Sequence, residues 1–189
     1  WSGSGRGDYR ESPLELAGEP ADFRYTGYKI HEGGVSMACG LPQAHDARET
    51  LEITLSQPGA ELTLFYTAFP AAIVRRTVLT NTGDKPLRLN KLMSSCVDLP
   101  GSYTMATFNG GWIAEMRRCD TPVGASKVVN ESLTGSSSNR HNPGFLLYEP
   151  GATEDAGTVY SFNLIYSGNH YAAAPVSYTH LTLPTNSLV

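Results

Sequence analysis

Two neighbouring segments of this chain alternate regularly between apolar and polar side chains. In Glu49–Ser56 every second residue is leucine or isoleucine, and Glu61–Phe69 repeats the same period of two. Successive side chains of a β-strand point to opposite faces, so each segment is predicted to be a half-buried strand. The residues between them, 57–60, read Gln-Pro-Gly-Ala, which is typical of a turn. The two segments are therefore predicted to form a β-hairpin.

The rest of the chain continues this pattern of short strands and turns. Glycine and proline occur between the apolar runs, and no segment sustains the 3.6-residue period of a helix. The sequence therefore predicts an all-β fold, a sandwich or a barrel. Further strands are predicted over Ala72–Thr80, Leu87–Leu99, Tyr103–Phe108, Trp112–Arg117 and Val159–Tyr166.

Three details of these strands are predicted from residue type. Gly83 can adopt a positive φ and Pro86 cannot donate to a ladder, so a turn is predicted after Ala72–Thr80. A β-bulge is expected near Ser94 and Ser95. The run Asn109-Gly110-Gly111 is expected to be the turn that separates two strands, with Trp112 at the start of the second.

Composition and charge exclude several classes of protein. The chain has 189 residues, 14 Lys+Arg against 18 Asp+Glu, and a formal net charge of -4. This charge, without a basic cluster, argues against a nucleic-acid partner. No apolar run approaches the roughly 18 residues that span a membrane. The three cysteines are widely spaced and predict reduced thiols in a cytoplasmic protein, with one disulfide as the alternative.

Common catalytic and cofactor motifs are absent from the sequence. There is no GxSxG, GxxxxGK[ST] or GxGxxG sequence, and the five histidines are isolated from one another. No zinc-ligand spacing occurs, so no metal site is predicted. Glycoside hydrolysis needs two carboxylates, and each carboxylate in the chain is predicted to be a turn or surface residue instead. The carboxylates considered are Asp8, Asp98, Glu115, Asp120, Glu154 and Asp155.

Aromatic residues are a better indication of function. Most of them are expected to pack in the core. Trp112 is the exception, because it adjoins a glycine turn from which a ring can project into a cleft. Sugar rings have apolar C–H faces that stack on aromatic rings, so Trp112 is a candidate sugar contact.

Read in order, several segments resemble the N-terminal domain of family 36 glycoside hydrolases, the bacterial-type α-galactosidases. The resemblance covers nearly all of residues 5–170, and its ordered series is more specific than any single piece. The matching segments are GRGDYRESP (5–13), DFRYTGYKI (22–30), GLPQAHDARETLEITL (40–55), LTLFYTAF (62–69), RRTVLTNTGDKPLRLNKLMSSCVDLPG (75–101), NGGWIAEMRR (109–118) and SSSNRHNPGFLLYEPGATEDAGTVYSFNLIYSGNH (136–170).

This resemblance implies a large two-layer antiparallel β-supersandwich that precedes a catalytic (β/α)8 barrel. The parent enzyme would remove terminal α-1,6-linked galactose from melibiose, raffinose or related oligosaccharides, with retention and without a cofactor. It would be a homo-tetramer. Both catalytic carboxylates would belong to the barrel, so this chain is expected to lack catalytic residues and to be inactive alone.

Two residues of this chain match substrate contacts of the family. Asp8, in GRGDYR, matches an aspartate that contacts galactose, and Trp112, in NGGW, matches a tryptophan that forms a wall of the same pocket. The resemblance therefore implies that this domain supports assembly and completes the sugar pocket. Gly144 departs from the family pattern, because an aromatic residue usually follows HNP.

The expected domain covers residues 1–175 and is truncated at both ends, without the barrel. Residues 176–189 do not continue the preceding pattern and resemble translated sequencing adapter, so they are expected to be a non-native tail. The alternative for this tail is a genuine β-strand and turn. The alternative for the whole chain is a free-standing carbohydrate-binding or purely structural β-sandwich.

Overall fold

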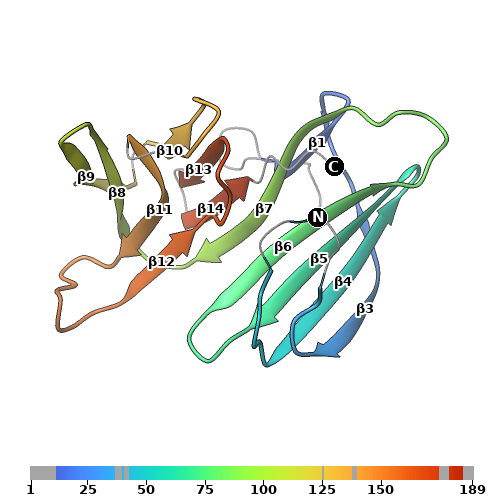
Figure 1. Ribbon diagram of the computed structural model, residues 1–189, viewed down its shortest axis with the longest axis horizontal. Coiled ribbons are helices and arrows are strands. Elements are labelled where there is room, and N and C mark those ends of the chain that lie inside the picture. Colours follow the sequence, from blue (N-terminus) through green and yellow to red (C-terminus); the bar gives the residue numbers. More distant parts are fainter. Residues whose placement is uncertain are drawn as a thin grey trace. The chain divides into compact units, whose positions relative to one another are not determined.

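The computed structural model describes residues 12–36, 40, 43–124, 126–137, 140–174 and 179–184. Within these residues the regular secondary structure consists of β-strands in antiparallel sheets, without a helix (Figure 1). The chain divides into two compact units, whose described parts are residues 12–95 and the residues from 96 onward. The prediction of an all-β antiparallel sandwich is confirmed. In the part of the chain covered by the structure, no helix could cross a membrane.

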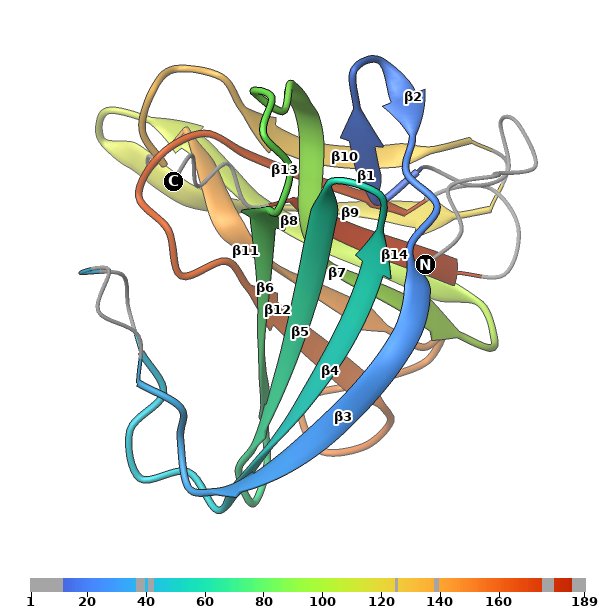
Figure 2. The ribbon, with the colours of Figure 1, turned by 90° about the vertical axis from the view of Figure 1, so that its right-hand side faces the viewer.

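The first unit contains two sets of antiparallel strands. One is a four-stranded sheet with the order β3-β4-β5-β6, whose strands lie side by side in Figure 2. In the other, β1 pairs with both β2 and β7. The strands are β1 Leu14–Leu16, β2 Glu19–Pro20, β3 Arg24–Glu32, β4 Glu49–Gln57, β5 Ala60–Ala68, β6 Ile73–Asn81 and β7 Leu89–Leu99, which continues into the second unit.

Apolar side chains from both sets of strands form the core of the first unit. Burial of these side chains removes apolar surface from water, which holds the two layers together. The unit is therefore a two-layer sandwich. Its buried core consists of Leu14, Leu16, Ala21, Phe23, Leu55, Ala60, Leu62, Leu64 and Leu92.

The predicted hairpin is confirmed as β4 and β5. The two strands pair along their full length, and Gln57 lies opposite Ala60, which leaves Pro58 and Gly59 as the loop. Gly59 has a φ of 81°, a conformation that glycine adopts without a steric penalty. This hairpin was predictable because its period and its turn residues are both local signals.

Strand β4 differs from the prediction, because it is covered on both faces rather than half buried. Leu55 faces the core, while Thr50 on the opposite face is also fully buried. The hydroxyl of Thr50 donates a hydrogen bond to the carbonyl of Gly33 at 2.7 Å and lies 3.0 Å from the hydroxyl of Thr67. Gly33, the residue that follows β3, therefore lies against this end of the sheet.

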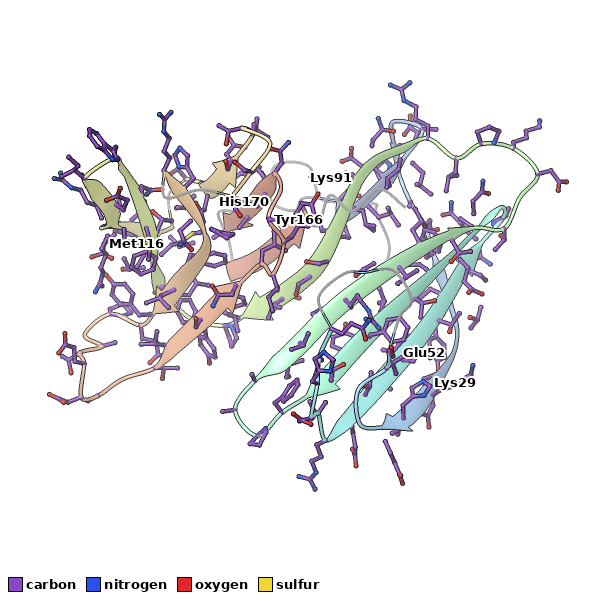
Figure 3. All side chains as sticks on the ribbon, in the orientation of Figure 1. Lys29, Glu52, Lys91, Met116, Tyr166 and His170 are labelled. Carbon is purple, nitrogen blue, oxygen red and sulfur yellow. The ribbon has the colours of Figure 1, made fainter. Side chains whose placement is uncertain are left out.

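The same second face carries an ionic cluster between β3 and β4. One carboxylate oxygen of Glu52 lies 2.7 Å from Nε2 of His31. The other oxygen lies 3.8 Å from Nζ of Lys29, and Figure 3 labels Lys29 and Glu52 on these neighbouring strands. Polar residues in the alternating pattern of β4 thus make specific contacts.

The turn predicted around Gly83 is confirmed, because it lies between the end of β6 and the start of β7. Gly83 does not have a positive φ. A Cβ on Gly83 would lie 3.3 Å from the Cα of Gly59, so the glycine permits close approach of two loops. A bulge in the β1–β7 pairing lies at Asn90, between the partners of Leu16 and Glu15. This pairing ends at Leu92, so the bulge expected near Ser94 and Ser95 stays a prediction.

The second unit also has two sets of antiparallel strands. One is a four-stranded sheet with the order β12-β11-β8-β9, and the other contains β10, β13 and β14 in that order. Strand β14 lies within the segment expected to be a non-native tail, and the origin of this tail stays a prediction. The strands are β8 Tyr103–Gly111, β9 Ala114–Val123, β10 Val128–Ser132, β11 His141–Tyr148, β12 Val159–Asn163, β13 His170–Ala174 and β14 Thr179–Pro184.

The core of the second unit lies between β8 and β11 on one side and β10 and β13 on the other. The rings of Phe145 and Phe162 stack with centroids 5.1 Å apart, and the Tyr103 hydroxyl donates to the carbonyl of Pro100 at 2.9 Å. Burial, together with nearby Tyr160 and Glu149, raises the pKa of Tyr103. The buried residues of this core are Tyr103, Met105, Val128, Phe145, Leu147, Ala172 and Ala174.

Candidate functional site

Strands β8 and β9 form a hairpin whose connection is only two residues long. Gly111 lies opposite Ala114, so Trp112 and Ile113 alone join the strands. The prediction of a turn at Asn109–Gly111 is wrong, since these residues continue β8 and Trp112 lies in the turn. We call residues 110–116 the hairpin tip.

The hairpin tip exposes three large apolar side chains to solvent. Trp112 is 88% exposed, Ile113 is 78% exposed, and Met116 is also exposed. Single exposed apolar residues are ordinary, whereas several together on a protruding element indicate a contact surface. The tip therefore presents an indole ring that nothing in the described residues covers.

The backbone of the tip is strained at two positions. Ile113 has a φ of 67° and Met116 a φ of 57°, both in the left-handed region. This region costs about 1–2 kcal/mol for residues with a Cβ, and a β-branched residue is especially rare there. Such strain persists where the surrounding structure imposes it, and it is often found at functional sites.

A β-bulge shapes the base of the tip. Asn109 lies opposite Arg117 and Gly111 opposite Ala114, so two residues of β9 face the single residue Gly110. A Cβ on Gly110 would overlap the carbonyl group of Ala114. Only glycine fits at this position without a shift of the backbone.

The beginning of β11 supports the tip from the side. The N–H of Gly110 donates to the carbonyl of Arg140 at 3.2 Å. Nδ1 of His141 lies 3.2 Å from the side-chain oxygen of Asn109. The side-chain amide of Asn142 donates to the sulfur of Met116, which Figure 3 labels, at 3.3 Å. The sequence His141-Asn142-Pro143 therefore supports the hairpin tip that carries Trp112.

Charged side chains follow the tip along β9. Nε of Arg118 donates to the carboxylate of Asp120 at 2.8 Å. The guanidinium of Arg118 lies over the ring of Tyr148, 5.1 Å from its centroid. An exposed aromatic ring with polar groups nearby can bind a sugar, because the ring covers an apolar face while polar groups bind hydroxyls.

A second unusual residue of this unit is His170, which begins β13 opposite Ser132 of β10 (Figure 3). Its side chain is 3% exposed, and neither ring nitrogen has a hydrogen-bond partner among the described residues. Burial lowers the pKa of His170, and the nearby His141 lowers it further. The sequence contained no signal for this, because His170 appeared as one of five isolated histidines.

The structure also bears on the other residues that the sequence singled out, which are Asp8, the candidate carboxylates and the cysteines. Asp8 lies outside the described residues, so the structure does not place it beside Trp112. Of the carboxylates, Asp120 pairs with Arg118, and Glu115 accepts a hydrogen bond within the tip. Cys119 is a free thiol. Among the residues that the structure covers, no cluster of His, Cys, Asp and Glu could hold a metal ion.

Sequence reasoning identified Trp112 but missed the residues that shape its surroundings. Ile113 and Met116 carry no local signal for a left-handed conformation. Asn142 belongs to the His141-Asn142-Pro143 sequence, which carries no local signal for a contact with Met116. To find them, the turn would have had to be placed at Trp112 and Ile113, with two residues of β9 opposite Gly110.

Comparison with known proteins gives a consistent result. Residues 1–183 match the glycosyl hydrolase family 36 N-terminal domain. The chain is 35% identical over 178 residues to a probable alpha-galactosidase G of Emericella nidulans, covering 87% of this chain and 24% of the relative. It is 33% identical over 177 residues to the bifunctional alpha-galactosidase/sucrose kinase AgaSK of Mediterraneibacter gnavus, covering 87% of this chain and 19% of the relative. The chain thus spans about a quarter or less of these relatives.

Solved structures are similar over almost the whole chain. The galactosidase domain of AgaSK superposes with a TM-score of 0.86 at 31% identity, covering 97% of this chain and 27% of that one. A variant of the alpha-galactosidase AgaA from Geobacillus stearothermophilus, in complex with stachyose, superposes with a TM-score of 0.85 at 30% identity, with the same coverage of both chains.

Proposed function

This chain belongs to the glycosyl hydrolase family 36 N-terminal domain family, and from that premise we propose that it completes the sugar pocket of an α-galactosidase. The relatives that it matches are named as alpha-galactosidases. The parent protein is proposed to hydrolyse terminal α-1,6-galactosides of the melibiose and raffinose type, with retention of configuration.

The observation that carries this proposal is the exposed indole of Trp112 on a supported, strained tip. A residue this exposed contributes little to folding, yet Gly110, Asn109 and Met116 hold the loop that carries it. In complexes of AgaA variants the bound molecules are 1-deoxygalactonojirimycin, stachyose and raffinose. These complexes support the proposal that the parent protein binds a galactoside.

Asp8 is proposed as the second contact, because a carboxylate accepts hydrogen bonds from two sugar hydroxyls well. Retaining hydrolysis needs a nucleophilic carboxylate and an acid/base carboxylate. We assign neither to this chain and place both in the catalytic region of the parent. No cofactor is proposed. The other proposed partners are further copies of the parent protein, which would form a homo-tetramer. The proposed location is the cytoplasm.

Kinetics of the longer gene product test the role of Trp112. We expect Trp112→Ala to raise KM for raffinose about ten- to hundredfold, because burial of a large apolar side chain contributes about 1.5–3 kcal/mol. The kcat should change little, since stacking stabilises the bound substrate and the transition state alike. Tyr28→Ala is the matched control, because Tyr28 is an aromatic residue 62% exposed in the other unit.

An unchanged KM in Trp112→Ala would contradict the pocket role. The chain of 189 residues alone is expected to show no hydrolysis of raffinose. If the reading frame of the gene does not continue into a catalytic region, the free-standing carbohydrate-binding or structural domain becomes the better interpretation.

A further inference from the structure

We infer that Glu115 is a positioning residue, whose carboxylate holds the Trp112 side chain in its binding orientation. This inference rests on the proposed function of Trp112. The N–H of Ile113 donates a hydrogen bond to Oε1 of Glu115, at an N···O distance of 3.1 Å. Glu115 thus has a different role from those considered for it in the sequence.

The geometry of the peptide bond gives this hydrogen bond its effect. The N–H of Ile113 belongs to the peptide group that joins Trp112 to Ile113. Because that group is planar, the direction of its N–H is set by ψ of Trp112. A carboxylate that accepts from this N–H therefore restricts the backbone dihedral that directly follows the Cα of Trp112.

The loop needs such a restraint, because its two turn residues are exposed. Trp112 and Ile113 are both largely exposed, so packing against the protein does not hold them. Ile113 has a φ of 67°, which a β-branched residue disfavours. A hydrogen bond to an ionised carboxylate is stronger than a neutral one and opposes relaxation of this strain.

The rest of the tip is held at a different place. Gly110 at its base donates to the carbonyl of Arg140, and Asn142 contacts Met116. These contacts fix where the hairpin lies on the sheet. These two contacts do not involve the peptide group between Trp112 and Ile113, which is hydrogen-bonded to Glu115. The base and the end of the tip are thus restrained separately.

The first measurement follows the motion of Trp112 in this chain. The sequence has two tryptophans, so Trp1→Phe leaves Trp112 as the only one. In this background we expect Glu115→Ala to lower the steady-state fluorescence anisotropy of Trp112 and to increase its quenching by acrylamide. Glu115→Gln should restore most of the original anisotropy and protection from quenching, since the side-chain amide oxygen can accept the same hydrogen bond.

Two further variants make this measurement specific. Glu115→Asp keeps the charge but shortens the side chain, so it should mobilise Trp112 as the alanine variant does. It also serves if Glu115→Ala does not fold. Glu131→Ala is the control, because Glu131 is an exposed glutamate on β10, a strand that is not part of the tip. Unchanged anisotropy in both Glu115→Ala and Glu115→Asp would overturn the inference.

The second measurement is the kinetics of the longer gene product. We expect Glu115→Ala to raise KM for raffinose about three- to tenfold with kcat unchanged, which corresponds to the loss of one hydrogen bond. Glu115→Gln should recover most of the affinity. If Trp112→Ala raises KM while Glu115→Ala does not, the positioning role is wrong and the proposed function stands. If neither variant changes KM, the proposed function fails, and this inference fails with it.

Discussion

His170 is an imidazole inside the sandwich of the second unit, where water cannot solvate a charge. Its two ring nitrogens lack partners among the described residues, so the neutral form is the one that burial favours. His141 would repel a proton on His170 and acts in the same direction. At the scale of the residue, this histidine makes the fold sensitive to acid.

The sign of this effect follows from proton binding. Burial holds the pKa of folded His170 below its ordinary value of 6.5, so the unfolded chain binds more protons as the pH falls below that value. We expect the free energy of unfolding to decrease by at most about 1.4 kcal/mol per pH unit from this residue. This loss continues until the pH passes the folded pKa.

Urea unfolding at a series of pH values between about 8 and 5 measures this loss, in the range where His170 titrates. His170→Asn should flatten the pH dependence relative to the unmodified chain. His45→Asn, which removes an exposed histidine, should leave it unchanged. Equal pH dependence in all three proteins would contradict the assignment to His170.

At the scale of the element, the β8–β9 hairpin contains two adjacent glycines that differ in their surroundings. A Cβ on Gly110 would overlap the backbone of Ala114 and Glu115, whereas a Cβ on Gly111 would meet nothing within 4 Å. The bulge opposite Gly110 creates this difference. Substitutions of Gly110 and Gly111 therefore test whether the bulge lies opposite Gly110.

We expect Gly110→Ala to lower the free energy of unfolding by about 1–3 kcal/mol, the usual cost of forcing an added group into a filled site. Gly111→Ala should change it by less than about 0.5 kcal/mol, as surface substitutions commonly do. Thermal unfolding of both variants measures the difference. Equal effects of the two substitutions would show that the bulge is not at Gly110.

At the scale of the whole molecule, the residues that the structure describes form two separate hydrophobic cores. One is formed in the first unit around Leu62, and the other in the second unit around Met105. Both side chains are fully buried. A cavity in either core should weaken the strands that surround it.

We expect Leu62→Ala and Met105→Ala each to lower the free energy of unfolding by about 2–5 kcal/mol. Leu62→Ala should accelerate hydrogen exchange in β4 and β5, and Met105→Ala should accelerate it in β8 and β11, because each cavity loosens its own unit. In the double variant the effects should add to within about 0.5 kcal/mol. Uniform acceleration through the whole chain in either single variant would contradict two separate cores.

Much of this fold could be predicted from the amino-acid sequence, because the signals for its strands and for many of its turns lie in short segments. The period of two in β4 and β5 and the Pro58-Gly59 turn need no distant contact to be recognised. The ordered motifs of the family likewise lie in the sequence, and the comparisons confirm the family. Trp112 could be selected as a candidate by residue type and by motif.

Features that depend on segments far apart in the chain required the folded structure. Thr50 is buried where its hydroxyl contacts Gly33 and Thr67. The turn moves to Trp112 and Ile113 because a bulge and the contact of Gly110 with Arg140 fix the register of β8 and β9. His170 is buried only when β13 pairs with β10, 38 residues earlier at Ser132. Local side-chain chemistry specifies alternation and turns, but register and burial come from which distant surfaces pack together, and no short segment contains that information.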